Sequence, residues 1–169
     1  DFAAPELPAT THLSIVDAQG NAVALTSSIE NAFGSRIMAA GLLLNNQLTD
    51  FSFVPGGANQ VAPGKRPLSS MAPTLVFAPD GALFAVLGSP GGGRIINYVA
   101  NALVALIDWE LSPAAALALP HFGSRNGPTE LEAGRHPPEW AEGLRTRGHP
   151  LRAVEMTSGT HLIVRARNG

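Results

Sequence analysis

Polar and apolar residues alternate along two neighbouring stretches, "TTHLSIV" at residues 10–16 and "AVALTSS" at residues 22–28. A period of two is typical of a half-buried β-strand. The intervening "DAQGN" contains Asp17 and Gly20, which are both common turn residues. Residues 10–28 are therefore predicted to form a β-hairpin.

The middle of the chain predicts a second hairpin followed by helices. Strands are expected near residues 74–78 and 82–87, joined by the turn "PDG". Apolar residues then recur at helical spacing through "RIINYVANALVALIDW", residues 94–109. A further helix is expected after Ser112, which suits a cap, and Pro113, which suits the first helical position.

The remaining segments complete an α+β pattern within one domain. "GLLL" at residues 41–44 is expected to be a short buried segment, and residues 54–67, with three Pro and three Gly, a long loop. Residues 136–149 predict a surface helix closed by Gly148. Residues 151–156 and 160–166 predict closing strands. Two hairpins, then helices, then strands favour a layered α+β fold, and 169 residues can bury a real core.

Composition narrows the classes of function. Only 14% of residues are charged, below the usual quarter or so, which indicates that a partner chain covers much of the surface. A net charge of −2 argues against a nucleic-acid partner, and no window of about 18 apolar residues predicts a membrane span. With no cysteine and no metal-ligand spacing among the histidines, neither a metal nor a cofactor is expected. The histidines are His12, His121, His136, His149 and His161.

The glycine-rich loop "GSPGGGR", residues 88–94, precedes the predicted helix. Amides at a helix N-terminus favour negative charge. The loop lacks the lysine of a P-loop and the spacing of a dinucleotide fingerprint. If the loop is functional, an oxyanion hole for a tetrahedral intermediate fits it better than a phosphate site. The alternative is that the loop has no chemical role and forms a tight strand-to-helix turn.

Thr10 stands at the start of the first strand, directly after "PA". A β-branched residue suits a strand entry. Alternatively the bond before Thr10 breaks, and its hydroxyl becomes a nucleophile with its own α-amine as the base. The reference pKa of about 7.7–8.0 lets such an amine accept a proton near neutral pH. A triad of His12, Ser14 and Asp17 is discounted because Asp17 lies on the opposite strand face, in a turn.

Three other polar clusters interrupt apolar segments. "PLSSM" at residues 67–71 offers two hydroxyls that could hold a carboxylate or cap a turn. Glu30, in "TSSIEN", and the cluster "NNQLTD" at residues 45–50 offer carboxylates and an amide. These groups could hold a substrate ammonium or form a solvated loop.

In this order, "TTHLSIVDAQGNAV", "LLLNNQLTDF", "PGKRPLSSMAPT" and "GSPGGGRII" resemble the small subunit of the γ-glutamyltranspeptidases, or glutathione hydrolases. These are N-terminal-nucleophile hydrolases. The likeness runs from about residue 10 into the helix after residue 94, and more loosely to about residue 165. It implies a four-layer αββα sandwich shared by a large and a small subunit, with this chain supplying the small-subunit half.

The resemblance also implies roles for individual residues. Thr10 matches the catalytic threonine that autocatalytic cleavage after Ala9 releases, and Ser28 matches the hydroxyl that tunes it. The oxyanion-hole glycines correspond to Gly91 and Gly92. The contacts to the substrate α-amino group correspond to Glu30, Gln47 and Asp50. The pair that holds the α-carboxylate corresponds to Ser69 and Ser70.

The implied protein is an autoprocessing γ-glutamyltransferase or hydrolase that cleaves γ-glutamyl amides such as glutathione through a threonine acyl-enzyme. Residues 1–9 would be the tail of the large subunit, and residues 10–169 the small subunit, C-terminally truncated relative to the family. Its partners would be the large subunit of the same precursor and a small γ-glutamyl substrate. A glutaryl or cephalosporin-type amide acylase and an inactive fragment with an assembly role remain alternatives. The resemblance favours a periplasmic or extracellular location, and a cytoplasmic location remains an alternative.

Overall fold

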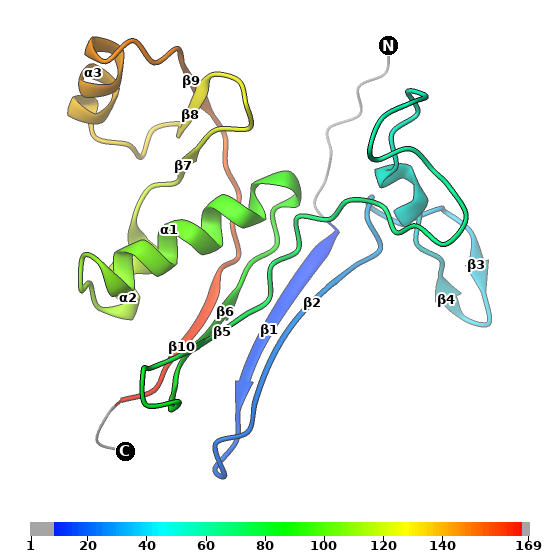
Figure 1. The fold of residues 1–169 in the computed structure, drawn as a ribbon, viewed down its shortest axis with the longest axis horizontal. Coiled ribbons are helices and arrows are strands. Elements are labelled where there is room, and N and C mark those ends of the chain that lie inside the picture. Colours follow the sequence, from blue (N-terminus) through cyan, green and yellow to red (C-terminus); the bar gives the residue numbers. More distant parts are fainter. Residues whose placement is uncertain (1–8, 167–169) are drawn as a thin grey trace.

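The computed structural model describes residues 9–166 (Figure 1). The expected large-subunit tail at residues 1–9 lies outside this range apart from Ala9. Strands β1 (Thr10–Val16) and β2 (Ala22–Ser28) pair antiparallel, with Thr10 opposite Ser28. The carboxylate of Asp17 accepts hydrogen bonds from two backbone amides of the turn, which closes it. The predicted hairpin at residues 10–28 is confirmed.

A second sheet contains β5 (Thr74–Phe77), β6 (Leu83–Gly88) and β10 (His161–Val164), in the order β10-β6-β5. All its pairings are antiparallel, and β6 is central. The predicted second hairpin and the last closing strand are thereby confirmed. Four consecutive residues of β6, from Ala85 to Gly88, are buried, because the sheet is covered on both faces.

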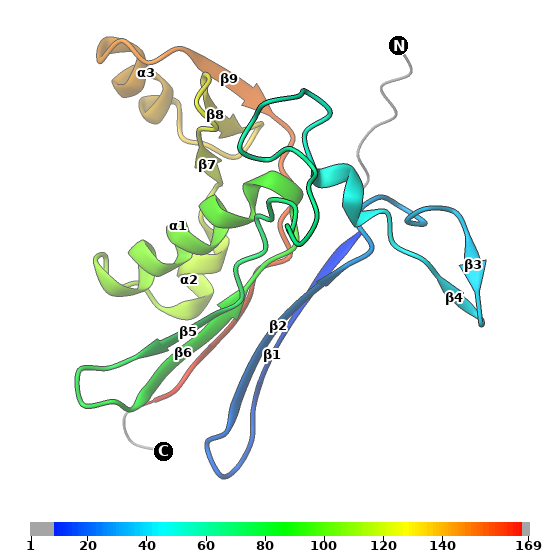
Figure 2. The ribbon, with the colours of Figure 1, turned by 45° about the vertical axis from the view of Figure 1, so that its right-hand side comes forward.

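The layers stack as hairpin, sheet and helices (Figures 1 and 2). Helix α1 (Ile95–Ile107) packs on one face of the second sheet, where Leu87 joins Ile95 and Val99 in a buried cluster. The β1–β2 hairpin covers the other face, where Gly88 contacts His12. Helix α2 (Pro113–Ala118) follows α1, and the Ser112 hydroxyl caps it as predicted.

This order gives three layers, two of strands and one of helices, within residues 9–166. The α+β class is therefore confirmed. The helical layer that a four-layer sandwich requires on the outer face of the hairpin has no counterpart among the described residues.

A third sheet stands apart from the main layers, at the upper left of Figure 1. It pairs β7 (Phe122–Gly123) with β8 (Thr129–Glu132), and β8 in parallel with β9 (Leu151–Val154). Helix α3 (Pro138–Thr146) packs beside β9. The sequence predicts α3 and β9 but neither β7 nor β8. Two buried residues of β8, Glu130 and Glu132, carry carboxylates, so the strand lacks the apolar pattern from which a buried strand is predicted.

The prediction that residues 41–44 are buried is wrong. They lie in and beside a small exposed hairpin of β3 (Met38–Ala39) and β4 (Leu42–Leu43), and Leu42 is 68% exposed. An apolar run alone cannot distinguish a core from a surface that another chain covers. The predicted loop at 54–67 contains no helix or strand. Two short 3-10 helices, η1 (Gln47–Asp50) and η2 (Gly92–Arg94), complete the fold.

The contact between Gly88 and His12 fixes how closely the two sheets approach. His12 is 2% exposed, and its ring nitrogens hydrogen-bond Thr26 at 2.8 Å and Ser14 at 3.1 Å. A Cβ atom on Gly88 would lie 2.2 Å from His12 Cε1. We expect Gly88→Ala to lower the free energy of unfolding by about 1–3 kcal/mol, since overpacking forces a shift of the backbone or the ring.

Urea denaturation tests this expectation, with Gly127→Ala as the matched control. A Cβ atom on Gly127 would meet nothing within 4 Å, so that variant should stay within about 0.5 kcal/mol of the wild type. Equal stabilities for the two variants would contradict the packing argument.

Candidate active site

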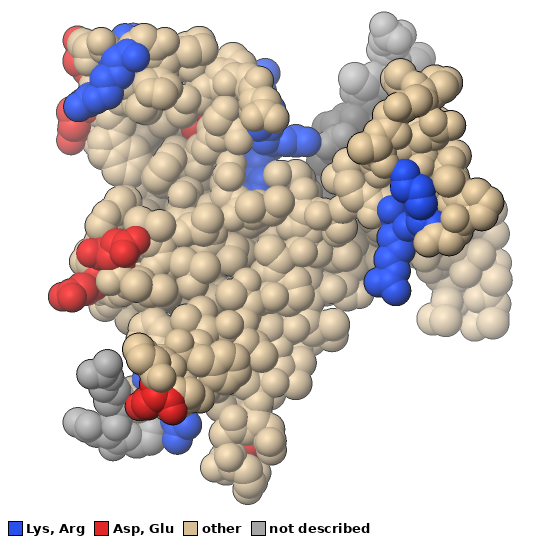
Figure 3. Space-filling model, in the orientation of Figure 1, with Lys and Arg blue, Asp and Glu red and all other residues tan. Residues whose placement is uncertain are grey.

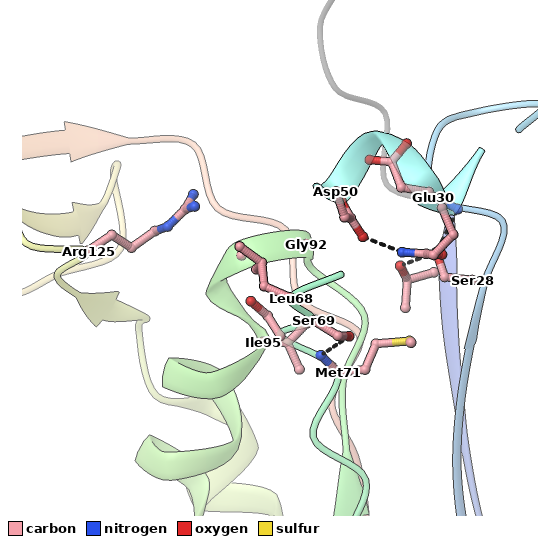
Figure 4. A pocket seen from close by; sticks show the side chains of 13 residues that line it. Ser28, Glu30, Asp50, Leu68, Ser69, Met71, Gly92, Ile95 and Arg125 are labelled. Atoms are coloured by element: carbon pink, nitrogen blue, oxygen red, sulfur yellow. Dashed lines mark hydrogen bonds between the residues drawn. The ribbon is translucent and has the colours of Figure 1, made fainter. Parts of the chain in front are cut away.

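A cavity of about 230 Å³ lies where β1 begins and β2 ends, facing η1 and the turn that precedes α1 (Figure 4). Every site residue predicted from the sequence lines it, apart from Ala9 and Gly91. These residues are Thr10, Ser28, Glu30, Gln47, Asp50, Ser69, Ser70 and Gly92. The fold thus brings together five segments that are far apart in the sequence.

The hydroxyls of Thr10 and Ser28 face each other across the hairpin, because these residues are opposite in the strand register. Thr10 Oγ1 donates a hydrogen bond to Ser28 Oγ at 3.0 Å. Ser28 Oγ also accepts a hydrogen bond from the backbone N–H of Glu30 at 2.9 Å. Ser28 Oγ is the acceptor in both of these hydrogen bonds, so its own hydrogen is available to donate to a further oxygen. This arrangement polarises the Thr10 hydroxyl at the cavity wall.

Two carboxylates form one side of the cavity. Glu30 adopts a positive φ of 73°, which is uncommon for a residue with a side chain. Its carboxylate accepts hydrogen bonds from Asn46 Nδ2 at 2.5 Å and, more weakly, from Thr49 Oγ1 at 3.4 Å. The side-chain amide of Gln47 donates to the Asp50 carboxylate. This side is therefore suited to hold an ammonium group.

The serine pair reaches the cavity on the extended segment before β5. Ser69 Oγ accepts the backbone N–H of Met71 at 3.2 Å, a local turn contact that leaves its hydrogen free to donate (Figure 4). The Ser70 hydroxyl has no hydrogen-bond partner within residues 9–166. Both serines can therefore donate to an oxygen of a ligand.

The glycine loop closes the cavity between β6 and α1. Gly91 and Gly92 have φ values of 136° and 57°. A Cβ atom on Gly91 would also lie 2.5 Å from Tyr98 Cε2, so both the backbone and the packing require glycine there. Gly91 lines a second cavity, of about 320 Å³, which shares Thr10 and Gly92 with the first. Amides of such a loop can stabilise an anion.

Charged groups beside this loop hold it against the third sheet. Buried Glu130 accepts Arg94 Nε at 2.9 Å and is also paired with Arg152. The hydrogen bond from Arg94 is the main cause that lowers the pKa of Glu130, so the carboxylate stays ionised. Burial raises the pKa of Tyr98 and lowers the pKa of His12 and of His121. Both imidazoles are therefore neutral near pH 7.

Arg125 is the lining residue that the sequence did not indicate. It lies on the loop between β7 and β8, and its guanidinium lies over Gly93: a Cβ atom there would be 2.6 Å from Arg125 Cζ. No sequence signal marks this residue, because its loop joins two unpredicted strands. Asn46, which donates to the Glu30 carboxylate, belongs to the predicted polar cluster at residues 45–50, but the sequence does not single it out within that cluster.

Within residues 9–166, no group of three or more histidine, aspartate or glutamate residues is placed to hold a metal ion. No helix in that range has both the length and the apolarity needed to cross a membrane.

Comparison with known proteins shows what the fold resembles. The Helicobacter pylori gamma-glutamyltranspeptidase T380A mutant superimposes with a TM-score of 0.84 at 33% identity, covering 91% of this chain and 90% of that one. The cephalosporin acylase from Bacillus halodurans gives a TM-score of 0.81 at 27% identity, covering 92% of this chain and 30% of that one. The fold is thus that of an N-terminal-nucleophile hydrolase, in its small-subunit part.

Sequence comparison is more specific. The chain belongs to the gamma-glutamyltranspeptidase family, whose sequence profile matches residues 1–169. It is 42% identical over 168 residues to the glutathione hydrolase proenzyme of Escherichia coli K12, covering 92% of this chain and 29% of the proenzyme. It is 36% identical over 157 residues to the acylase ACY 1 proenzyme of Pseudomonas sp. SE83, covering 91% and 28%. The chain therefore spans under a third of the length of these relatives.

Proposed function

We propose that this chain contains the catalytic small-subunit part of an autoprocessing γ-glutamyl hydrolase and transferase, with Thr10 as its nucleophile. In this proposal residues 1–9 belong to the end of the large subunit and residues 10–169 belong to the small one. The observation that carries it is the Thr10 hydroxyl, hydrogen-bonded to Ser28 at the wall of a cavity with groups for an ammonium, a carboxylate and an oxyanion. The names of the proenzyme relatives support a precursor that is cleaved.

Cleavage of the precursor supplies the catalytic base. Thr10 Oγ1 attacks the carbonyl carbon of Ala9, the C–N bond breaks, and the acyl group moves from nitrogen to oxygen as an ester. Water then hydrolyses this ester, which leaves a carboxylate on Ala9 and a free amine and hydroxyl on Thr10. Before cleavage that nitrogen is an amide and cannot accept a proton; afterwards it can.

The same hydroxyl then acts on the substrate. Thr10 Oγ1 attacks the γ-carbonyl of a glutamyl amide while its α-amine takes the hydroxyl proton. The Gly91 and Gly92 amides stabilise the oxyanion, each contributing about 3 kcal/mol. The leaving amine receives the proton as the tetrahedral intermediate collapses to an ester. Water or an amino-acid amine then attacks this ester, which gives hydrolysis or transfer.

The substrate's glutamyl end is recognised by the two sides of the first cavity. Glu30, Gln47 and Asp50 bind the α-ammonium, and Ser69 and Ser70 donate to the α-carboxylate. A substrate without an α-amino group would leave Glu30 and Asp50 without a cationic partner, which disfavours a glutaryl compound. Because the relatives include an acylase and a cephalosporin acylase, an acylase for glutaryl or cephalosporin-type amides is the second candidate.

Turnover of two anilides by the mature two-subunit enzyme separates these candidates. The γ-glutamyl anilide carries the α-amino group, and its glutaryl analogue lacks only that group. We expect a higher kcat/KM for the γ-glutamyl compound. A preference for the glutaryl compound would assign the protein to the acylases, and no turnover of either would favour an inactive fragment with an assembly role.

An exposed apolar face supports a large subunit as the partner. Leu13 pairs with Leu25 and Ile15 with Val23 across the hairpin, on the face turned away from the second sheet. These side chains are 36–53% exposed. In Figure 3, charged groups occupy a few separate places around a broad uncharged centre. A helical layer of the large subunit on the hairpin would complete the four-layer sandwich and bury these residues.

A further inference from the structure

The second cavity adjoins the first at Thr10, the proposed nucleophile. Both are lined by Thr10, Glu30, Gly92, Gly93 and Arg125. The second extends away from the serine pair and Asp50. Its further lining residues are Asn31, Gly91, Arg94, Tyr98, Glu155 and Thr157. If the first cavity holds the glutamyl end of a donor, the leaving-group part beyond the scissile amide can occupy the second cavity, because both cavities meet at Thr10.

We propose that Arg125 binds the C-terminal carboxylate of the leaving group, and then that of the acceptor, in the second cavity. This inference rests on the proposed function, since it concerns the same acyl transfer. A leaving group or acceptor that is an amino acid or short peptide carries a C-terminal carboxylate. A guanidinium can bind such a group through two parallel hydrogen bonds.

The charges around the cavity single out Arg125 for this role. Arg94, which also lines it, is already bound to buried Glu130. Arg125 has no hydrogen bond or ion pair within residues 9–166, and its side chain is exposed. Its guanidinium packs on Gly93 of the glycine loop and lines both cavities. In Figure 4 it lies on the opposite side of Gly92 from Glu30 and Asp50.

Glu155 adds the opposite charge to the same cavity. A free amino acid or dipeptide acceptor is a zwitterion, with one ammonium and one carboxylate. A cavity with Arg125 and Glu155 in its lining therefore matches that class of acceptor better than an uncharged amine or a dicarboxylate. The amine must lose its proton before it attacks the ester, and the Thr10 α-amine is the base available beside it.

Three donors that differ only beyond the scissile amide test the role of Arg125. They are a γ-glutamyl dipeptide with a free C-terminal carboxylate, the same dipeptide as its C-terminal amide, and the γ-glutamyl anilide. In mature wild-type enzyme we expect the carboxylate donor to have a higher kcat/KM than the amide donor. Arg125→Gln should lower the carboxylate-to-amide ratio by about 10- to 100-fold, the range for one charge-assisted contact.

The matched control is Arg145→Gln on α3, which removes a guanidinium that is also exposed but lines neither cavity, and it should leave the ratio unchanged. Arg125→Lys should retain part of the preference, because a lysine supplies charge without the planar fork. All rates are normalised to the mature subunit measured by intact mass. If Arg125→Gln does not mature, Arg125→Lys is compared with wild type on the same donors.

The outcomes separate this inference from the proposed function. An unchanged ratio in the Arg125 variants, or an equal loss on all three donors, would overturn the role of Arg125. Wild-type enzyme that turns over none of the three donors would contradict the proposed function itself.

Discussion

Thr10→Ala is expected to leave the precursor uncleaved and to lower kcat for a γ-glutamyl anilide by at least about 1000-fold. The substitution removes the hydroxyl that, in the proposed mechanism, attacks Ala9 in the precursor and the γ-carbonyl in the substrate. Without cleavage, the Thr10 nitrogen also remains an amide and supplies no base. A denaturing gel, intact mass and anilide turnover measure the two effects on the same preparation.

The adjacent residue provides the control. Thr11 is exposed on the same strand, opposite Ser27, and lines neither the first nor the second cavity. Thr11→Ala should mature fully and keep kcat within about threefold. Thr10→Ser keeps a hydroxyl and should still be cleaved. Normal maturation of Thr10→Ala would remove Thr10 from the cleavage step, and normal turnover by it would remove Thr10 from catalysis.

Asp50→Asn is expected to lower kcat/KM for the γ-glutamyl anilide by about 30- to 1000-fold, which corresponds to about 2–4 kcal/mol for a charged partner lost in a binding site. The asparagine keeps the size of the side chain and removes the charge that would bind the α-ammonium. The glutaryl analogue has no such group, so its kcat/KM should change far less. Steady-state kinetics on both anilides give the comparison directly.

Asp80→Asn is the matched change away from the site. Asp80 lies in the turn between β5 and β6, where its carboxylate accepts the backbone N–H of Ala82, a contact that an asparagine can also make. Both substrates should be turned over by this variant as by the wild type. An equal loss on both anilides in Asp50→Asn would show that Asp50 positions η1 and does not select the ammonium.

The elements with clear periodicity could be predicted from the sequence. The two hairpins alternate with a period of two, and α1 has apolar residues at helical spacing, so local pattern and final fold agree. β8 could not be predicted, since its buried Glu130 and Glu132 are satisfied by arginines that the pattern does not reveal. The apolar run around Leu42 predicts a buried segment, but its side chains are exposed in this chain.

The sequence predicts which residues belong to the site, but their own local patterns do not predict that these residues come together in one cavity. Each polar cluster, taken alone, also fits a turn or a solvated loop. Their meeting around Thr10 depends on the register of β1 with β2 and on the packing of the hairpin against β6. Arg125 reaches the same cavity from a separate sheet, and tertiary placement of that kind leaves no mark in the local sequence.

The first residue of the smaller subunit, determined by N-terminal sequencing and intact mass on catalytically active protein, tests the central claim most directly. A precursor carrying both subunits should yield a chain that starts at Thr10 with a free amine, and a second chain that ends at Ala9. Full activity in protein whose Ala9–Thr10 bond is intact, or whose smaller chain starts at another residue, would contradict the mechanism.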